Sequence, residues 1–199
     1  MGNLILIGVD IGQKREPTAI CVAELVERKE GEHRVINHFI VRHLESLPLG
    51  TPYPGVAVRL SELTSGIRRH TRRSLYLYVD ATGLGQPIID LLRQETTGIL
   101  SITPVYFTHG DQRTREGGQI RLGKAYLVSR LQTLLQTGRL HLPRTAESER
   151  LAQELLDYEI QVSEDANDRY GAFRVGSRDD LVTALGLAVH KEPRRFGVF

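Results

Sequence analysis

Several residue types that often direct an interpretation are scarce or absent in this chain. One of its 199 residues is cysteine, one is methionine and none is tryptophan. The single cysteine, Cys21, excludes an internal disulfide and a zinc site built from cysteines, which fits an intracellular setting. No apolar run approaches the roughly 18 residues that span a bilayer, so we expect no membrane contact. The first residues carry no basic leader, and we expect a core strand there rather than a signal peptide.

The chain also lacks a strong charge of either sign. It has 26 lysines and arginines against 24 aspartates and glutamates, a net charge of +2. Only four of the basic residues are lysines, and arginine is the side chain that binds phosphates bidentately and stacks on bases. This bias favours nucleic-acid binding, but a GC-rich genome or a hot habitat would produce the same bias. Composition alone therefore leaves both interpretations open.

The chain is long enough to bury a core as a single domain over residues 1–199. Its first part contains three apolar runs joined by short turns, at residues 4–10, 18–26 and 35–44. The first run is almost continuously apolar, as in a central strand that is buried on both faces. We therefore predict a meander of three antiparallel strands.

The remainder of the chain alternates between helical and strand periodicity. The expected elements are a helix at 56–67, a strand at 74–80, a helix opening at 88–92, a strand at 99–107, a loop at 108–118, a helix at 122–135, a short strand at 140–142, a helix at 147–156, a hairpin with strands 158–163 and 172–176 around the tip 164–171, and a final helix at 178–190. Strands joined through helices pair in parallel by right-handed crossovers. The predicted fold class is α/β, a mixed sheet flanked by helices with an added β-hairpin.

Two aspartates end strands in the same manner. Asp10 follows the most apolar run and precedes Ile-Gly, and Asp80 ends the run at 74–80 and precedes a Gly-rich turn. A carboxylate that ends a buried strand is costly to desolvate unless it meets a cation or several hydrogen-bond donors. If the two strands are parallel neighbours, both carboxylates lie at the edge where open α/β sheets bind their ligands.

A pair of acids, Asp179 and Asp180, opens the final predicted helix. The small and apolar face of this helix is expected to pack on the sheet, so the pair can reach the same edge as the strand-terminal aspartates. Carboxylates that converge in this way repel one another unless divalent cations lie between them. Ligands that are all oxygen atoms indicate Mg²⁺ or Mn²⁺.

Each acidic residue also has a plain structural interpretation. An aspartate before glycine at a strand end is common turn chemistry. Ser177 with Asp180 fits a capping box, and Asp179 would favour the helix dipole without any ligand. The acids of the hairpin tip are expected to be solvated. The joint pattern, two strand-terminal aspartates and an Asp-Asp helix start in this order of elements, favours a metal site.

At these residues the chain resembles the nuclease domain of large terminase subunits, which package viral DNA in tailed phages. The resemblance rests on Asp-Ile-Gly at 10–12, on Asp80 with its Gly-rich turn, and on the Asp-Asp pair followed by Ala-Leu at 184–185. It also includes a helix that carries Lys124 and leads to the short strand at 140–142. The motifs span nearly the whole chain, and their order and spacing are more specific than any one of them.

The resemblance implies an RNase H-like fold and hydrolysis of double-stranded DNA by two metal ions, with little sequence preference. It implies that Asp10, Asp80 and Asp179 bind Mg²⁺ or Mn²⁺, with Asp180 in or beside that set. The family often has histidine where this chain has Arg178, which leaves the role of that position open.

A full terminase also contains an ATPase motor, whereas no phosphate-binding loop occurs here. We therefore expect either an excised domain or a stand-alone relative, acting in the host cytoplasm with a motor domain or other packaging subunits.

Four basic residues are candidates for contact with DNA. Lys124, on a helix after the polar loop, could orient the scissile phosphate or stabilise developing charge. Arg113, Arg115 and Arg121, in the Gly-containing loop region, could follow a DNA backbone. The alternatives are a solvated lysine at a helix start and a mobile, solvated loop.

Three other functions remain open at this point. A Holliday-junction resolvase would share the fold and the carboxylates, and Arg-rich loops do not separate the two. An actin-like ATPase or sugar kinase also places Asp-x-Gly at strand ends, but it needs two such lobes and a longer chain. A DNA-binding or assembly module that has lost its chemistry would be the alternative without catalysis, although retention of all the acids speaks against it.

Overall fold

The computed structural model of the chain describes residues 4–12, 14–31, 34–84, 86–96, 98–99, 101–161, 169–171 and 178–192. The strands are β1 (Leu4–Asp10), β2 (Ala19–Glu30), β3 (Arg34–Ser46), β4 (Leu75–Asp80), β5 (Ser101–Thr108), β6 (Arg113–Glu116), β7 (Gln119–Gly123), β8 (Leu140–His141), β9 (Glu159–Gln161) and β10 (Arg169–Gly171). The helices are α1 (Tyr53–His70), α2 (Gln86–Glu95), α3 (Lys124–Gln136), α4 (Ala146–Asp157) and α5 (Asp180–Val189). No helix among these residues is long and apolar enough to cross a bilayer.

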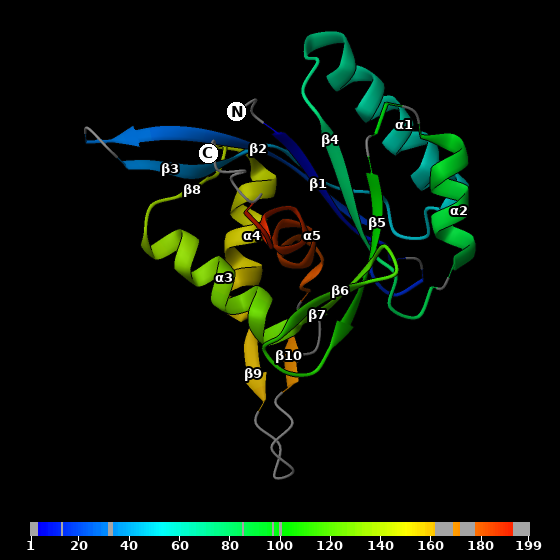
Figure 1. Ribbon diagram of the computed structural model, residues 1–199. Helices are drawn as coiled ribbons and strands as arrows, with labels where there is room; N and C mark the ends of the chain where they lie inside the picture. Colours follow the sequence, from blue (N-terminus) through cyan, green and yellow to red (C-terminus); the bar gives the residue numbers. More distant parts are fainter. Residues whose placement is uncertain are drawn as a thin grey trace.

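Eight strands form one mixed sheet in the order β6-β7-β5-β4-β1-β2-β3-β8 (Figure 1). The pairs β1–β2 and β2–β3 are antiparallel, which confirms the predicted meander. The pairs β1–β4, β4–β5 and β3–β8 are parallel, as expected for strands joined through helices. The pair β5–β7 is also parallel, although strand β6 and its turns connect the two strands. The carboxyl ends of β1, β4, β5 and β7 therefore share one edge of the sheet, which we call the carboxyl edge.

Helices cover both faces of the sheet, as the sequence predicted (Figure 1). One face packs against α1 and α2, and the other against α3, α4 and α5. Strand β1 shows how the faces alternate: Ile5, Ile7 and Val9 join the α1–α2 core, whereas Leu6 joins the α5 side. Successive side chains of a strand point to opposite faces, so even-numbered positions of β1 face α5.

One predicted segment is wrong in part. Residues 108–118 were expected to form a loop, but the segment Arg113–Glu116 is strand β6 and pairs antiparallel with β7. The two strands are joined by Gly117 and Gly118, both with positive φ, which is the two-glycine turn that hairpins favour. The same hairpin delays the next helix, which was expected from residue 122 but begins at Lys124, because residues 119–123 belong to β7.

The predicted hairpin is present, with its second strand at a different position. Strands β9 and β10 pair antiparallel as a separate two-stranded sheet. Strand β10 covers residues 169–171, which were expected in the tip of the hairpin. The expected second strand, residues 172–176, lies outside the described residues. The remaining predicted helices and strands are confirmed, with ends that differ by a few residues.

Candidate metal centre

The sheet register brings the two strand-terminal aspartates together. Strands β1 and β4 are parallel neighbours, and Val9 is the partner of Val79, so Asp10 and Asp80 are at adjacent positions of the carboxyl edge. On β4, Tyr76 and Tyr78 pack against the α5 core, and the alternation of side chains places Asp80 on that face too. Both aspartates therefore belong to the side of the sheet that α5 covers.

Helix α5 approaches this face closely because Gly8 of β1 has no side chain. A Cβ atom there would lie 2.0 Å from the carbonyl oxygen of Ala184 and 2.6 Å from the backbone nitrogen of Ala188. Every residue of α5 is buried, including Asp180 at 1% exposure. The close contact sets the first turn of α5, with Asp179 just before it, beside the ends of β1 and β4.

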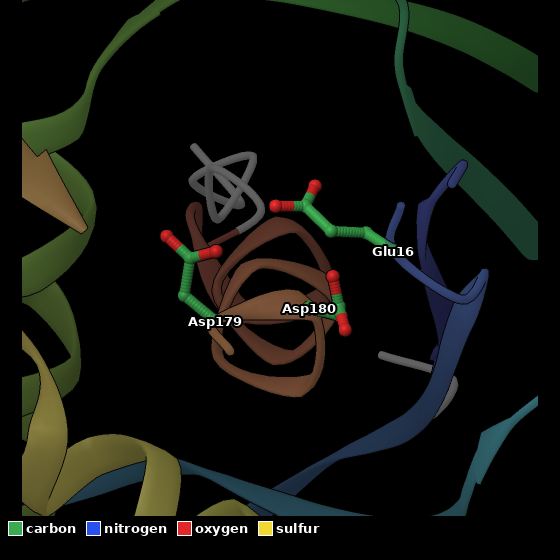
Figure 2. A group of neighbouring side chains, drawn as sticks. All are labelled: Glu16, Asp179 and Asp180. Atoms are coloured by element: carbon green, nitrogen blue, oxygen red, sulfur yellow. The ribbon is translucent and has the colours of Figure 1, made fainter. Parts of the chain in front are cut away.

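A third acidic element lies in the turn after β1. Figure 2 shows Glu16 extending across the start of α5 towards Asp179 and Asp180. One carboxylate oxygen from each of the three residues lies within 4.8 Å of the other two. Glu16 is exposed, Asp179 is partly buried and Asp180 is buried, so the group opens to solvent on the Glu16 side.

Glu16 was missed by the sequence analysis, and little in the sequence could have revealed it. It lies in a short charged turn that reads as solvated. The turn folds back onto Gly12, where a Cβ atom would lie 2.1 Å from the carbonyl oxygen of Glu16. Thr18 holds the same turn by donating its hydroxyl to the carbonyl oxygen of Gly12 at 3.1 Å. A glycine that permits a close return of the chain is therefore the indirect signal.

The carboxylates form one electrostatic group. Burial raises the pKa of Asp10 well above its ordinary value, and repulsion from Asp80, Asp180 and Asp179 adds to this effect. Burial raises the pKa of Asp180 to about 7, with further contributions from Glu16 and other nearby acids. Burial also raises the pKa of Asp80, although hydrogen bonds from Thr82 oppose the shift. Loss of hydration and mutual repulsion both disfavour the charged forms.

Few donors among the described residues compensate these charges. The backbone N–H of Thr82 donates to Oδ1 of Asp80 at 2.8 Å. The Nζ atom of Lys124 lies 3.9 Å from Oδ2 of Asp179 and 5.7 Å from the centre of the Phe107 ring. Oδ2 of Asp180 is buried and has no hydrogen-bond partner in the part of the chain that the structure describes. A buried, unpaired carboxylate oxygen is costly without a cation, and an all-oxygen donor set suits Mg²⁺ or Mn²⁺.

The structural interpretation of the Asp-Asp pair is tested at Asp179 alone. Asp179 occupies the N-cap position of α5, yet its side chain makes no capping hydrogen bond. Ser177, the partner in the expected capping box, lies outside the described residues. Asp179 therefore does not use its carboxylate as a local helix cap, and the capping box of Ser177 with Asp180 stays a prediction.

The three arginine candidates lie on the neighbouring strands β6 and β7, and Lys124 opens α3. Arg115 and Arg121 are exposed on β6 and β7, and Arg121 lines a cavity of ≈ 280 Å³ together with residues 108–112, which lead from β5 to β6. Arg113 differs from the expectation of a free loop arginine, because it is half-buried, and burial lowers its pKa. Its Nε atom is buried without a hydrogen-bond partner.

The mixed sheet, the helices on both of its faces and the acidic residues at its carboxyl edge are the features of an RNase H-like fold. The family model described as "Terminase RNaseH-like domain" matches residues 7–192. The chain therefore belongs to the terminase RNase H-like domain family, as its resemblance in sequence implied. No curated protein sequence matches the chain significantly.

Solved structures of viral terminases share this fold. The large terminase nuclease of the thermophilic phage G20c with bound magnesium has a TM-score of 0.65 at 19% identity, covering 94% of this chain and 80% of that chain. The manganese-soaked terminase nuclease domain of human cytomegalovirus has a TM-score of 0.56 at 16% identity, covering 93% and 82%. The large terminase of bacteriophage HK97 has a TM-score of 0.51 at 14% identity, covering 96% of this chain but 40% of that chain.

Proposed function

We propose that this protein is a divalent-metal-dependent endonuclease that cuts double-stranded DNA, with little sequence preference, during the packaging of a viral genome. The observation that carries the proposal is the buried, unpaired Oδ2 of Asp180 inside a group of carboxylates at the carboxyl edge. Folding such a group without compensating donors is unfavourable, and cation binding in the working protein offsets that cost. Membership in the terminase family supports DNA as the substrate.

The proposed ligands are Asp10, Asp80, Asp179 and Asp180, with Glu16 as an addition to the set predicted from sequence. Related nuclease structures contain magnesium or have been soaked in manganese, which supports these ions as the cofactors. A pair of divalent ions, when bound, activates water and offsets the charge on the leaving oxygen of a phosphodiester. The residues of the chain hold those charges in place and, through their burial at the start of α5, exclude bulk water from one side of the site.

Lys124 is the proposed positioning cation for the scissile phosphate. Its Nζ atom lies near Asp179, and the face of Phe107 holds the ammonium group on its other side. Arg115 and Arg121 extend this positive surface along the β6–β7 hairpin, and we propose that they contact the phosphate backbone. Arg113 belongs to the predicted DNA-contacting set, but its partial burial suggests a smaller share of the binding than that of the two exposed arginines.

The proposed partner, besides DNA, is an ATPase motor or another subunit of a packaging machine. The HK97 large terminase is longer than the region that this chain matches, which supports a motor in the same chain or in a partner. An intracellular setting, in the host cytoplasm, follows from the same proposal.

Cleavage of supercoiled plasmid DNA tests the proposal. With Mn²⁺ or Mg²⁺ we expect nicking followed by degradation, and Asp80→Ala should abolish both. Asp90→Ala is the matched control, because Asp90 is an exposed aspartate of α2 that bonds only to surface neighbours in the described part of the chain.

Several results would overturn the proposal. Cleavage that persists in excess chelator would exclude the metal mechanism. Cutting of four-way junctions with linear duplex spared would favour a resolvase. Salt-dependent DNA binding without any cutting would favour an assembly module.

A further inference from the structure

The first turn of α5 is capped from another helix. A helix start leaves backbone N–H groups without intrahelical acceptors, and a side chain at the N-cap position commonly accepts one of them. Here the acceptor is Oε2 of Glu154, on α4, which receives the N–H of Leu181 at 2.9 Å and that of Val182 at 3.3 Å. Glu154 is 27 residues away from Leu181 along the chain.

Helix α4 itself begins with an ordinary local cap. The hydroxyl oxygen of Thr145, its N-cap residue, accepts the backbone N–H of Ser148 at 3.3 Å. The contrast with α5 is informative, because a local cap at α5 would engage a carboxylate oxygen of Asp179 or Asp180. With Glu154 as the acceptor, neither aspartate is needed for this task.

Glu154 is placed there at an energetic cost. Its side chain is 7% exposed, and it repels Asp180, which lies beside it. Two backbone N–H donors and the positive end of the α5 dipole offset part of this cost. A residue that served packing alone would avoid burying a third negative charge next to Asp179 and Asp180.

We propose that Glu154 is a positioning residue of the metal centre. By capping α5 from α4, it fixes the first turn of the helix and leaves the carboxylates of Asp179 and Asp180 free to hold cations. This inference rests on the proposed function for its catalytic consequence, but the capping itself stands on hydrogen bonds between described residues. The sequence carried no signal for it, because Glu154 lies on an amphipathic helix remote from every acidic motif.

The test compares three variants of the full chain. Glu154→Ala removes the acceptor, Glu154→Gln keeps an acceptor oxygen without the charge, and Glu149→Ala is the control, an exposed glutamate of the same helix. The measurements are hydrogen exchange of the Leu181 and Val182 amides, calorimetric Mn²⁺ affinity, and kcat and KM for plasmid cleavage.

For Glu154→Ala we expect faster exchange at both amides, and about 10–100-fold weaker Mn²⁺ binding with a similar fall in kcat, the usual cost of losing a group that orients metal ligands. KM for DNA should stay unchanged. Glu154→Gln should restore slow exchange and most of the metal affinity, and Glu149→Ala should match the wild type. If Glu154→Ala is too unstable to purify, Glu154→Met, which keeps the length of the side chain but lacks a strong acceptor, should show the same fast exchange at both amides.

Three outcomes distinguish a failure of the cap, a failure of the positioning role and a failure of the proposed function. Exchange at Leu181 and Val182 that stays at the wild-type rate in Glu154→Ala or Glu154→Met would overturn the cap. Weaker stability with unchanged Mn²⁺ affinity would reduce Glu154 to a structural residue and overturn the positioning role. Wild-type protein that neither cuts DNA nor binds Mn²⁺, with the exchange pattern as expected, would overturn the proposed function while the cap stands.

Discussion

The carboxylates at the two ends of α5 have opposite surroundings: Glu192 is partly buried and paired, whereas Asp180 is buried in an acidic group. Beyond its C-terminal end, Glu192 accepts hydrogen bonds from Arg130 at 3.0 Å, from Asn37 at 3.2 Å and from Arg139. At its N-terminal end, Oδ2 of Asp180 has no such partner. The same helix thus separates a carboxylate that is fully compensated by the protein from one that is not.

The pKa directions express this difference. Burial by itself would raise the pKa of Glu192, but hydrogen bonds from Arg139, Arg130 and Asn37 bring it below the ordinary value. Burial raises the pKa of Asp180 to about 7, and neighbouring acids add to the shift. The paired carboxylate of Glu192 joins β3, α3 and the residue before β8 to the end of α5. The unpaired carboxylate of Asp180 instead marks a place where a cation can bind.

The largest expected effect comes from exchanging Asp180 for asparagine. Loss of a metal-ligand charge should lower kcat for plasmid cleavage by about 100-fold or more, since such ions supply several kcal/mol of transition-state stabilisation. The metal-free variant should be at least as stable as the wild type in thermal unfolding, because one repelling charge is gone. Normal cleavage by Asp180→Asn would show that Asp180, at the start of α5, is not a metal ligand.

Metal addition should stabilise the protein through the same end of α5. At a Mn²⁺ concentration of about 100 Kd, the melting temperature should rise by roughly 5–10 °C for a domain of this size. The rise should be much smaller in Asp180→Asn and undiminished in Glu192→Gln. An unchanged melting temperature across a Mn²⁺ titration of the wild type would contradict the assignment of the site.

The metal-free protein should lose stability as the pH rises. The folded pKa of Asp180 is about 7, above its ordinary value of 3.8, so the native state binds the extra proton between those values. The contribution of this proton to the stability of the folded state is fully present below the unfolded pKa of Asp180, and it is lost as the pH rises through about 7. Thermal unfolding in chelator should therefore occur a few degrees lower at about pH 8 than at about pH 5, and Asp180→Asn should reduce this difference. The opposite slope would show that other groups dominate.

Removing the charge of Glu192 should affect stability alone. Glu192→Gln weakens the hydrogen bonds from Arg130 and Arg139, and a loss of about 1–3 kcal/mol in the free energy of unfolding is typical of bonds to charged groups. Urea unfolding measures this loss, and kcat for plasmid cleavage should remain at the wild-type value. A lower kcat in Glu192→Gln under conditions where the variant is fully folded would mean that the C-terminal end of α5 influences the metal centre at its N-terminal end.

The smallest effect is expected at Glu16. Because this carboxylate is exposed, solvent screening limits its contribution to about 1 kcal/mol. Glu16→Gln should therefore raise the Mn²⁺ concentration needed for half-maximal cleavage by less than about fivefold. Glu27→Gln, an exposed change elsewhere on β2, is the control. A loss as large as that of Asp180→Asn would place Glu16 among the principal ligands.

Much of the fold could be predicted from apolar periodicity. The run at β1 and the helical spacing of α1 depend on local pattern, and the structure confirms both. The β6–β7 hairpin was missed because β6 is polar and mostly exposed, and because the apolar alternation of β7, Ile120 and Leu122, is too short to separate from the start of the next helix. The Gly-Gly turn was the available signal: Gly117 and Gly118 form a tight turn that joins two strands even though the first of them is polar.

The site was predictable to a different degree. Asp10 and Asp80 each end an apolar strand, and the sequence made their proximity depend on a parallel pairing of the two strands, which the structure shows. Glu16 and Glu154 carry no such mark, because each reaches the start of α5 through space, one from a turn that folds back and one from a neighbouring helix. Single-chain patterns report the neighbours along a strand or helix and not those across layers.

The sequence by itself determined the order of strands and helices, the class of the sheet, and the aspartates that end β1, end β4 and precede α5. Those features depend on residue spacing and on the cost of burying a charge. Only the tertiary structure decided which carboxylates are left without donors and which helix caps α5. Hydrogen-bond partners at 3 Å are set by the packing of distant segments, and a linear pattern holds no record of that packing.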